Sequence, residues 1–430
     1  MRRPTRLGLI GSSGFAAYHL WVINKLENEG LVKLVAIADP ADASNIRSRF
    51  ESQGGAWYGD FRDMLAETPD LDAVSIVAPI GYHEAMARAC IERGCFVYLE
   101  KPPVPTIRQL EDLIALDKRK RVSVGFQMIA SRGVQRIKKA VVEEELGKIE
   151  SIRAWGCWPR SHAYYRRAPW AGQMSLGGEP VFDGPATNGL AHLVHNIMYL
   201  ASPCPHEFDA PQEVEGELFR ARQIESYDVA CLRGRFQSGI LFSATLTHAT
   251  EHYLPFHLKV TGSKGWMQII ENGDGTKLET SSGEKFACGD PLKALLHLSY
   301  LATIDYIRGG RPRALTHLSD TRGYVMATNG MLVSSGGIRD IEDCWVRRFS
   351  SEGGEGVEVI GLPEAVDESG NTGKLFSEMR LPWAVNAPEA ISLDTTLGKR
   401  IGERFRSTGV EAFSSPGCNQ TPEGAIMRND

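Results

Sequence analysis

A lysine in a context suited to catalysis follows a short apolar run. The triplet Glu100-Lys101-Pro102 comes directly after residues 95–99, which have the composition of a buried strand. Pro102 has no backbone donor, so the strand must end here. An amine at the carboxyl end of a strand in a parallel sheet is placed to donate to a ligand oxygen. On its own, the same pattern also fits a surface lysine that only ends a strand.

Residues 183–200 hold a second group of side chains suited to proton transfer. Asn188 and His192 are four residues apart, and His195 follows within one turn. If the segment is helical, the three share one face. An imidazole with a pKa of about 6.5 suits general base work at neutral pH. The alternative is a core histidine satisfied by Asn188. No metal site is expected, because no cysteine or carboxylate completes a tetrahedral set with the histidines.

Aromatic and basic side chains gather within residues 155–170. Aromatic faces suit the C–H groups of a sugar ring, and guanidinium groups donate to hydroxyl or carboxylate oxygens. Such a mixture also occurs in single-stranded nucleic-acid sites, but 48 basic against 53 acidic residues give no cationic field. Packing between domains explains any single tryptophan equally well. The candidates for substrate contact are Trp158, Arg160, Tyr164, Tyr165 and Trp170.

The elements that must position Lys101 have the order of a dinucleotide-binding fold. An apolar strand over residues 7–10 leads into a glycine-bearing turn at 11–16 and then a helix, so backbone N–H groups would face a pyrophosphate. The strand over residues 32–38 ends in Asp39, at the spacing of the acid that accepts from ribose hydroxyls. This carboxylate would repel a 2′-phosphate and favours NAD over NADP. A turn or N-cap aspartate is the alternative.

Further alternation predicts a Rossmann-type, doubly wound parallel sheet. A buried strand over residues 73–78 and a helix over 83–93 precede the strand before Lys101. Together these motifs resemble those of the Gfo/Idh/MocA family of nicotinamide-dependent oxidoreductases, over roughly residues 5–345. The resemblance departs from the usual family pattern at Ser13, Ile80, Asn188, His195 and Gln127.

The resemblance implies roles for individual residues. His192 would take the substrate proton, and Lys101 would donate to the same oxygen and stabilise its developing charge. Asn188 or His195 would orient this pair, and Lys101, Asn188 and His192 would contact the substrate. The residues implied for cofactor binding are Gly11, Ser12, Ser13, Gly14, Phe15, Asp39, Ala78, Pro79, His83, Glu100, Lys101 and Gln127.

The second half of the chain predicts an α/β domain with an open, mainly antiparallel sheet. The family likeness implies that such a sheet makes contacts in a homo-oligomer, a dimer or tetramer. We expect three regions: a dinucleotide-binding domain over 1–125, a substrate and oligomerisation domain over 126–350, and an acidic, Gly/Ser-rich extension over 351–430. The extended segments are expected at 149–158, 214–222, 227–236, 240–247 and 256–262.

Length and cysteine usage complete these expectations. The 430 residues suffice for two full cores, and the eight cysteines lack paired spacing, which fits a reducing cytoplasm. No apolar stretch is long enough to cross a membrane, and neither a membrane nor nucleic acid is an expected partner.

The sequence therefore predicts an NAD-dependent oxidoreductase that acts on a hydroxyl of a sugar, polyol or glycoside. A glycosidase or lyase that keeps its NAD bound and oxidises the sugar only transiently is the alternative. A dinucleotide-sensing binding protein is a third interpretation, against which the retention of Lys101 and His192 weighs.

Overall fold

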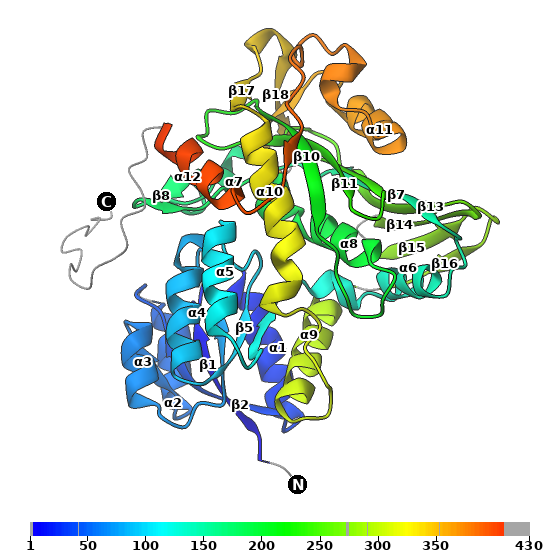
Figure 1. Cartoon of the computed structure of the whole chain (residues 1–430). Coiled ribbons are helices and arrows are strands. Elements are labelled where there is room, and N and C mark those ends of the chain that lie inside the picture. The colour runs from blue at the N-terminus through cyan, green and yellow to red at the C-terminus, as the bar shows by residue number, and fades with distance from the viewer. Residues whose placement is uncertain (1–2, 42, 272–274, 290, 352, 408–430) are drawn as a thin grey trace.

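The computed structural model describes residues 3–41, 43–271, 275–289, 291–351 and 353–407. Its first domain is formed by the N-terminal, blue to cyan part of the chain (Figure 1). This domain contains a six-stranded parallel sheet in the order β3-β2-β1-β4-β5-β6. The strand order reverses between β1 and β4, and in such sheets ligands bind at the carboxyl ends beside that point. The strands are β1 (Thr5–Ile10), β2 (Val32–Ala38), β3 (Ala56–Tyr58), β4 (Ala73–Ile76), β5 (Phe96–Leu99) and β6 (Val122–Val124).

Helices cover both faces of this sheet, which is why its central strands are almost wholly apolar. Four of the five helices before residue 125 follow a strand of the sheet directly. A further helix, α9 (Leu292–Ile307), packs beside α1 and completes the core with Leu296, Tyr300 and Ile304. The first domain is therefore not made of residues 1–125 alone. Its own helices are α1 (Ala16–Asn28), α2 (Ser44–Ser52), α3 (Phe61–Glu67), α4 (His83–Glu92) and α5 (Ile107–Leu116).

The second domain is built on a ten-stranded sheet. Its order is β16-β15-β14-β13-β7-β12-β11-β10-β17, and the short β20 (Ile391–Ser392) pairs with β10. Neighbouring strands are antiparallel except in the pairs β7–β12 and β10–β17. All five expected extended segments are confirmed as strands of this sheet. The sheet also contains strands that the sequence did not predict. They are β7 (Ile149–Cys157), β10 (Pro211–Arg220), β11 (Val229–Phe236), β12 (Leu241–Thr247) and β13 (Leu254–Gly262), and the others are β14 (Gly265–Glu271), β15 (Thr276–Thr280), β16 (Lys285–Ala287) and β17 (Ile338–Asp340).

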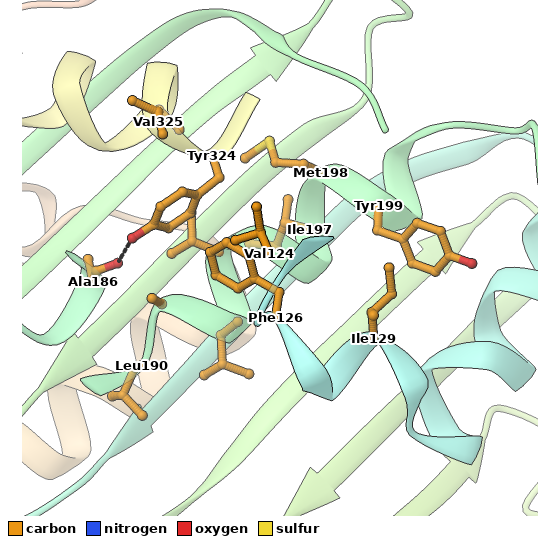
Figure 2. Close-up of a cluster of buried hydrophobic side chains, with 14 of the residues drawn as sticks. Val124, Phe126, Ile129, Ala186, Leu190, Ile197, Met198, Tyr199, Tyr324 and Val325 are labelled. Atoms are coloured by element: carbon orange, nitrogen blue, oxygen red, sulfur yellow. Dashed lines mark hydrogen bonds between the residues drawn. The ribbon is translucent and has the colours of Figure 1, made fainter. Parts of the chain in front are cut away.

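One face of this sheet packs against α6 (Arg132–Val142), α8 (Ala191–Ala201) and α10 (Arg322–Ser334). The resulting core extends to the first domain through Phe126, which follows β6 (Figure 2). Phe126 and Tyr324 of α10 are each 1% exposed, with ring centroids 5.1 Å apart. The Tyr324 hydroxyl donates to the carbonyl of Ala186 at 3.4 Å. This apolar junction fixes the second domain against the carboxyl end of β6.

The opposite face of the sheet is covered by the chain's own C-terminal region. Strand alternation turns Ala154 toward α8 and Trp155 toward α11 (Leu362–Thr372). A Cβ on Gly370 would lie 2.1 Å from the indole of Trp155, so glycine is required for this close approach. Trp383 packs on Phe219 of β10, with ring centroids 5.1 Å apart. The family likeness implies a solvated or partner-covered face, but the chain itself covers it at these strands.

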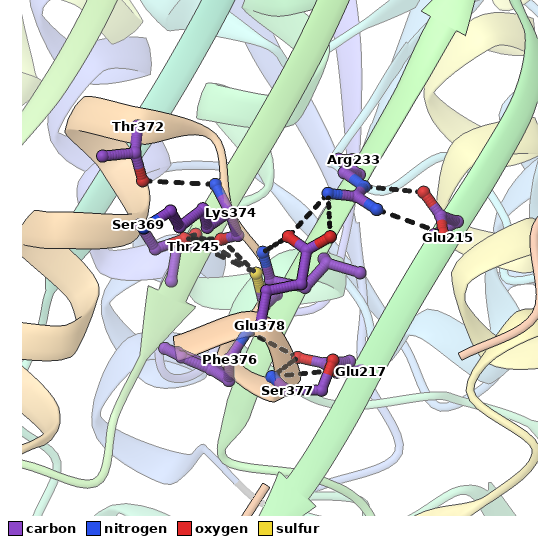
Figure 3. A network of polar contacts seen from close by, with 12 residues as sticks. Glu215, Glu217, Arg233, Thr245, Ser369, Thr372, Lys374, Phe376, Ser377 and Glu378 are labelled. Atoms are coloured by element: carbon purple, nitrogen blue, oxygen red, sulfur yellow. Dashed lines mark hydrogen bonds and ion pairs between the residues drawn. The ribbon is translucent and has the colours of Figure 1, made fainter. Parts of the chain in front are cut away.

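Polar contacts hold the C-terminal region, called the C-terminal layer below, in a fixed position on the sheet (Figure 3). The carboxylate of Glu217 is fully buried in β10 and accepts from the backbone N–H groups of Phe376 and Ser377 at 2.8 and 3.2 Å. Arg233 binds both Glu215 of the sheet and Glu378 of the layer.

The C-terminal layer also differs from the expected extension in where it begins. The expectation was an extension from residue 351, but the structure begins the layer with the hairpin of β18 (Val346–Ser351) and β19 (Gly354–Val359). A last helix, α12 (Leu397–Ser407), packs on α10 and α5. Residues 408–430 lie outside the described part of the chain.

Candidate active site

Lys101 lies just after the carboxyl end of β5, where the first domain contacts the second. Its ammonium group donates to the backbone carbonyl of Asn188 at 2.9 Å and to the side-chain Oδ1 of the same residue at 3.0 Å. Burial lowers the pKa of Lys101, while the negative charges of Glu100 and Asp183 raise it. The peptide bond to Pro102 is cis. The structure therefore brings together two of the predicted site residues, Lys101 and Asn188, from opposite domains.

Asn188 does not lie on the same helix as His192, in contrast to the expectation of one helical face. Residues Pro185–Gly189 form a single π-helical turn, and α8 begins only at Ala191. The Leu190 N–H donates to the carbonyl of Pro185 at 2.7 Å, which widens the turn by one residue. Two tyrosines hold the turn at Thr187. The Tyr227 hydroxyl lies 2.8 Å from the Thr187 hydroxyl, and the Tyr324 hydroxyl donates to the Thr187 carbonyl. Such widened turns are frequent at functional sites.

A carboxylate that the sequence analysis missed completes this group. Asp183 is 2% exposed, and its Oδ1 accepts from the Asn188 Nδ2 at 2.7 Å. Its Oδ2 accepts from the Gly172 N–H, also at 2.7 Å. Burial raises the pKa of Asp183, and the positive charges of Arg167 and Lys101 lower it. Asn188 thus bridges a cation and a carboxylate, which fixes the orientation of its amide.

His192 lies in the first turn of α8 and is half-buried. Burial lowers its pKa well below the usual range, and the positive charge of Lys101 lowers it further. Its Nδ1 is buried without a hydrogen-bond partner among the described residues. Burial therefore favours the neutral form of the ring, in which one nitrogen is unprotonated and can act as a base.

His195 has a different environment from the one expected for an orienting residue. Its ring is fully buried and stacks on Phe126, with centroids 3.9 Å apart and an interplanar angle of 3°. Phe208 and Tyr324 pack around it, and neither ring nitrogen has a hydrogen-bond partner within the described chain. Burial lowers the pKa of His195 to about 3. Of the two candidates for orienting Lys101, the structure places Asn188 beside it and His195 in the core.

The glycine turn has the geometry required to approach a phosphate group. Gly11 has φ +91°, and a Cβ there would lie 2.2 Å from the carbonyl oxygen of Val77. Gly14 has φ +60°, with open space where a Cβ would point, and Ser13 and Phe15 flank it on the turn. Ser12 donates to Oδ2 of Asp39 from both its backbone N–H and its hydroxyl, each at 2.7 Å. Asp39 therefore lies beside the glycine turn, and its Oδ1 also accepts from the Ala41 N–H at 2.9 Å, as a turn aspartate would.

Glu100 is directed into the first domain, toward His19. Its Oε2 accepts from the Lys101 N–H at 3.1 Å, and its Oε1 lies 3.2 Å from Nε2 of His19. The other nitrogen of His19 lies 2.7 Å from the hydroxyl of Tyr300, which comes from α9. A Cβ on Gly125 would lie 2.7 Å from Glu100 Oε1, so the residue after β6 must be glycine. This geometry supports a positioning role for Glu100.

His83 joins the ends of two strands. Its ring nitrogens lie 2.9 Å from the carbonyl oxygen of Ala78, which precedes Pro79, and 2.9 Å from that of Pro102. Burial lowers the pKa of His83, so the neutral ring donates to only one of them. Gln127 is 1% exposed, and its Oε1 has no hydrogen-bond partner among the described residues. The glycine turn, Asp39 and this free acceptor together fit a nicotinamide dinucleotide across the carboxyl ends of the strands.

The aromatic and basic cluster forms an alternating stack beside the π-helical turn. The Arg160 guanidinium lies 3.5 Å from the ring centre of Trp158 and 4.5 Å from that of Tyr164. Arg167 lies 3.6 Å from the ring centre of Tyr164 and 4.6 Å from that of Trp170. Two guanidinium groups and three aromatic rings from residues 155–170 thus form one continuous surface.

His248, which the sequence analysis also missed, connects this stack to the turn. Its Nδ1 lies 3.1 Å from the Tyr165 hydroxyl, and its Nε2 would lie 2.6 Å from a Cβ on Gly189. Tyr165 is buried, and its hydroxyl already has His248 as a partner, so it is not available for contact with a substrate. The remaining substrate candidates, Trp158, Arg160, Tyr164 and Trp170, are each half-buried. A lone histidine after a strand gives no sequence signal for this position.

The described part of the chain shows neither a metal site nor a membrane-spanning helix. No group of three or more His, Cys, Asp or Glu side chains is arranged there to hold a metal ion. Among the described helices, none is both long and apolar enough to span a bilayer.

Comparison with known proteins agrees with the fold and the motifs. The model of an oxidoreductase family with an NAD-binding Rossmann fold matches residues 5–127, and that of the GFO/IDH/MocA C-terminal domain matches residues 134–268. The chain is 33% identical over 122 residues to dTDP-3,4-didehydro-2,6-dideoxy-alpha-D-glucose 3-reductase of Saccharopolyspora spinosa. That match covers 28% of this chain and only 36% of the reductase.

Longer matches are more distant. Inositol 2-dehydrogenase/D-chiro-inositol 3-dehydrogenase of Lacticaseibacillus casei is 22% identical over 287 residues, which are 66% of this chain and 77% of that protein. The WlbA dehydrogenase of Bordetella pertussis, solved with NADH and UDP-GlcNAcA, superposes with a TM-score of 0.65 at 21% identity. The superposition covers 78% of this chain and 97% of WlbA, and it shows a shared fold. With both domain models matched in order along the chain, this protein belongs to the Gfo/Idh/MocA family.

Proposed function

We propose that the protein is an NAD(H)-dependent oxidoreductase acting on a hydroxyl of a sugar, polyol or glycoside. The observation that carries the proposal is the Lys101 amine after the end of β5, hydrogen-bonded to Asn188 of the second domain, with His192 close enough for the lysine charge to lower its pKa. When bound, the nicotinamide supplies the acceptor or donor of the hydride. The dehydrogenases and the reductase that this chain resembles are named for sugars and inositols, which supports this substrate class.

The residues of the chain divide the work on the substrate hydroxyl. An ammonium group has three donors, and Asn188 accepts from two of those on Lys101, which leaves one for the substrate oxygen. As the C–H bond gives up its hydride, His192 accepts the hydroxyl proton and the Lys101 donor stabilises the charge developing on the oxygen. Asn188 and Asp183 hold the lysine in place, and Gln127 offers an acceptor for the cofactor.

Four further properties belong to the same proposal. Asp39 at the glycine turn supports a preference for NAD over NADP, because its carboxylate would repel a 2′-phosphate. We propose a cytoplasmic location, supported by the seven described cysteines, all of which are free thiols. A small molecule is the proposed partner, since the chain carries a formal charge of −5 and no cationic field for nucleic acid. A homo-oligomer stays a prediction from the family likeness.

The test is a panel of monosaccharides, inositols and glycosides incubated with the protein and NAD, following NADH and released product together. Stoichiometric NADH with any member supports the dehydrogenase. Glycoside cleavage without NADH, with solvent deuterium entering the carbon next to the oxidised one, would instead identify redox-assisted cleavage. Absence of both reactions over the whole panel contradicts the proposal.

A further inference from the structure

We propose that Arg160 and Arg167 form an anion subsite, so that the substrate is a sugar carrying a carboxylate or phosphate group. This inference rests on the proposed function, because it names the substrate class of the same site. Neither guanidinium forms an ion pair with a carboxylate of the described residues. By contrast, Arg222 behind the same strand ends pairs with Asp228 at 2.8 Å, and both side chains are buried. Arg222 is therefore structural, whereas the charges of Arg160 and Arg167 are not neutralised by a direct contact.

Stacking on aromatic rings holds the two guanidinium groups in place. Stacking on Trp158, Tyr164 and Trp170 fixes each guanidinium against an aromatic face, which leaves hydrogen-bonding groups at its edge. The Nε of Arg160 is buried and has no hydrogen-bond partner among the described residues. Arg167 uses one terminal nitrogen to donate to the Tyr164 carbonyl at 2.6 Å. A planar fork with free donors matches the geometry of carboxylate and phosphate oxygens.

The stack is continuous with the reacting groups. Gly172, two residues after Trp170, donates its N–H to Asp183, which bonds Asn188 and through it Lys101. On the other side, the ring of Tyr164 lies 5.8 Å from that of His248, which borders the π-helical turn at Gly189. An anion held by the arginines would therefore belong to the molecule whose hydroxyl meets Lys101.

The charges around Lys101 are unequal in number. Lys101, Arg160 and Arg167 are positive, and the negative charges that act on Lys101 are those of Glu100 and Asp183, so the positive charges exceed the negative ones by one. Burial lowers the pKa of Lys101, and the positive charges of Arg167 and Arg160 lower it slightly further. A neutral sugar would leave this excess uncompensated, whereas one anionic group would balance it. In a half-buried site such a charge pair is worth more than in open water.

The experiment compares matched ligands on the protein saturated with NAD. The pairs are D-glucuronate with D-glucose, D-galacturonate with D-galactose, and glucose 6-phosphate and an inositol monophosphate with their neutral parents. Dissociation constants are measured by calorimetry at low ionic strength, and NADH formation is followed separately. At least one anionic member should bind about tenfold tighter or more than its partner, a difference of ~1.4 kcal/mol. The uronates and the phosphates separate the two sources of the anion.

Substitutions of the arginines test which residues cause the preference for anionic ligands. Arg160→Gln with Arg167→Gln should bring the ratio of affinities close to one without changing NAD binding. Arg160→Lys keeps the charge without the planar fork and should keep part of the preference. Arg166→Gln removes an exposed neighbouring charge outside the stack and should keep the full preference. These milder changes remain informative if the double variant does not fold.

Several outcomes overturn the inference: no anionic member binds more tightly than its neutral partner, the preference survives in the double variant, or Arg166→Gln removes it equally. NADH formation from neutral sugars without any anion preference would reject the subsite and keep the proposed function. Anion preference in binding without NADH from any member would keep the subsite and reject the proposed function.

Discussion

The Lys101 ammonium donates to two oxygens of a single residue, the backbone carbonyl and the side-chain Oδ1 of Asn188. The amide of Asn188 in turn donates to the buried carboxylate of Asp183. An asparagine therefore contacts the lysine directly, and the carboxylate of Asp183 reaches the lysine only through that asparagine. The lysine ammonium keeps one N–H donor for a substrate. The negative charge of Asp183 is held near the lysine by the Asn188 amide between them.

Replacing Lys101 with methionine should lower turnover by about two orders of magnitude or more, because one transition-state donor is lost. The side chain keeps a similar length, so folding and NAD binding should be retained. Steady-state kinetics and fluorescence titration with NADH check the two parts. Lys118→Met, at an exposed position, is the matched control. Activity of Lys101→Met within a few-fold of wild type would show that Lys101 only ends the strand.

Asp183→Asn should change the pH dependence of the reaction more than the binding of NAD. The Asp183 charge raises the pKa of Lys101, so its removal lets the lysine lose its proton at a lower pH. We expect the alkaline limb of kcat/KM to move to lower pH. A full pH–rate profile measures this, with the exposed Asp63→Asn as control. An unchanged limb would mean that Asp183 does not act on Lys101.

His192→Asn should lower turnover by about 10²- to 10⁴-fold, the usual range for losing a general base. Burial lowers the pKa of His192, so the acidic limb of the wild-type profile should lie below the ordinary pKa of a histidine. The variant should lack this limb, since the group that titrates is gone. Persistence of the same limb with a modest loss of rate would assign proton transfer to another group.

His195→Phe should make the protein less sensitive to acid. The folded pKa of His195 is about 3, below the ordinary value of 6.5 for the unfolded chain. Its contribution to stability is therefore complete above the unfolded pKa and declines as the pH falls from 6.5 toward 3, because the unfolded chain binds the proton first. The loss at pH 5 is about 2 kcal/mol.

Urea unfolding at pH 7 and pH 5 measures this difference in the free energy of unfolding. Phenylalanine can keep the stack on Phe126, so stability at pH 7 should change little. Equal acid sensitivity in wild type and variant would show that His195 is charged, or solvated, in the folded protein.

NAD should bind more tightly than NADP, and Asp39→Ser should reduce the difference. Losing a charge-assisted contact to the ribose hydroxyls costs roughly 1.5–3 kcal/mol. Titration of both cofactors by fluorescence quenching gives the two affinities. Asp39 also accepts from Ser12, so a circular dichroism melt should confirm that the turn is intact. Equal or tighter binding of NADP to the wild type contradicts the assignment of Asp39.

Local patterns predicted four of the six strands of the first domain, together with the helices that follow the first and the fourth strand in the chain. Apolar runs interrupted by glycine, proline or a single acid mark the ends of buried strands, and in a parallel sheet those ends meet at one edge. That is why the amino-acid sequence suffices to place Lys101, Asp39 and the turn at Gly11 at strand ends. The five extended segments of the second domain follow in the same way, because alternation is a property of neighbouring residues.

Tertiary packing decided what neighbouring residues do not encode. Residues 183–200 read as one helix, and the widened turn at Pro185–Gly189 arises from contacts with Tyr227 and Tyr324 far along the chain. Asp183 and His248 join the site only because Gly172 and Gly189 approach them.

The same holds for the C-terminal region and for α9. The acidic composition of residues 351–430 hides the apolar side chains that α11 and its neighbours place on the sheet. Helix α9 (Leu292–Ile307) completes a domain whose last strand, β6, ends far earlier in the chain, at Val124. Such long-range contacts depend on the shape of the partner surface, which no periodicity in a single sequence specifies.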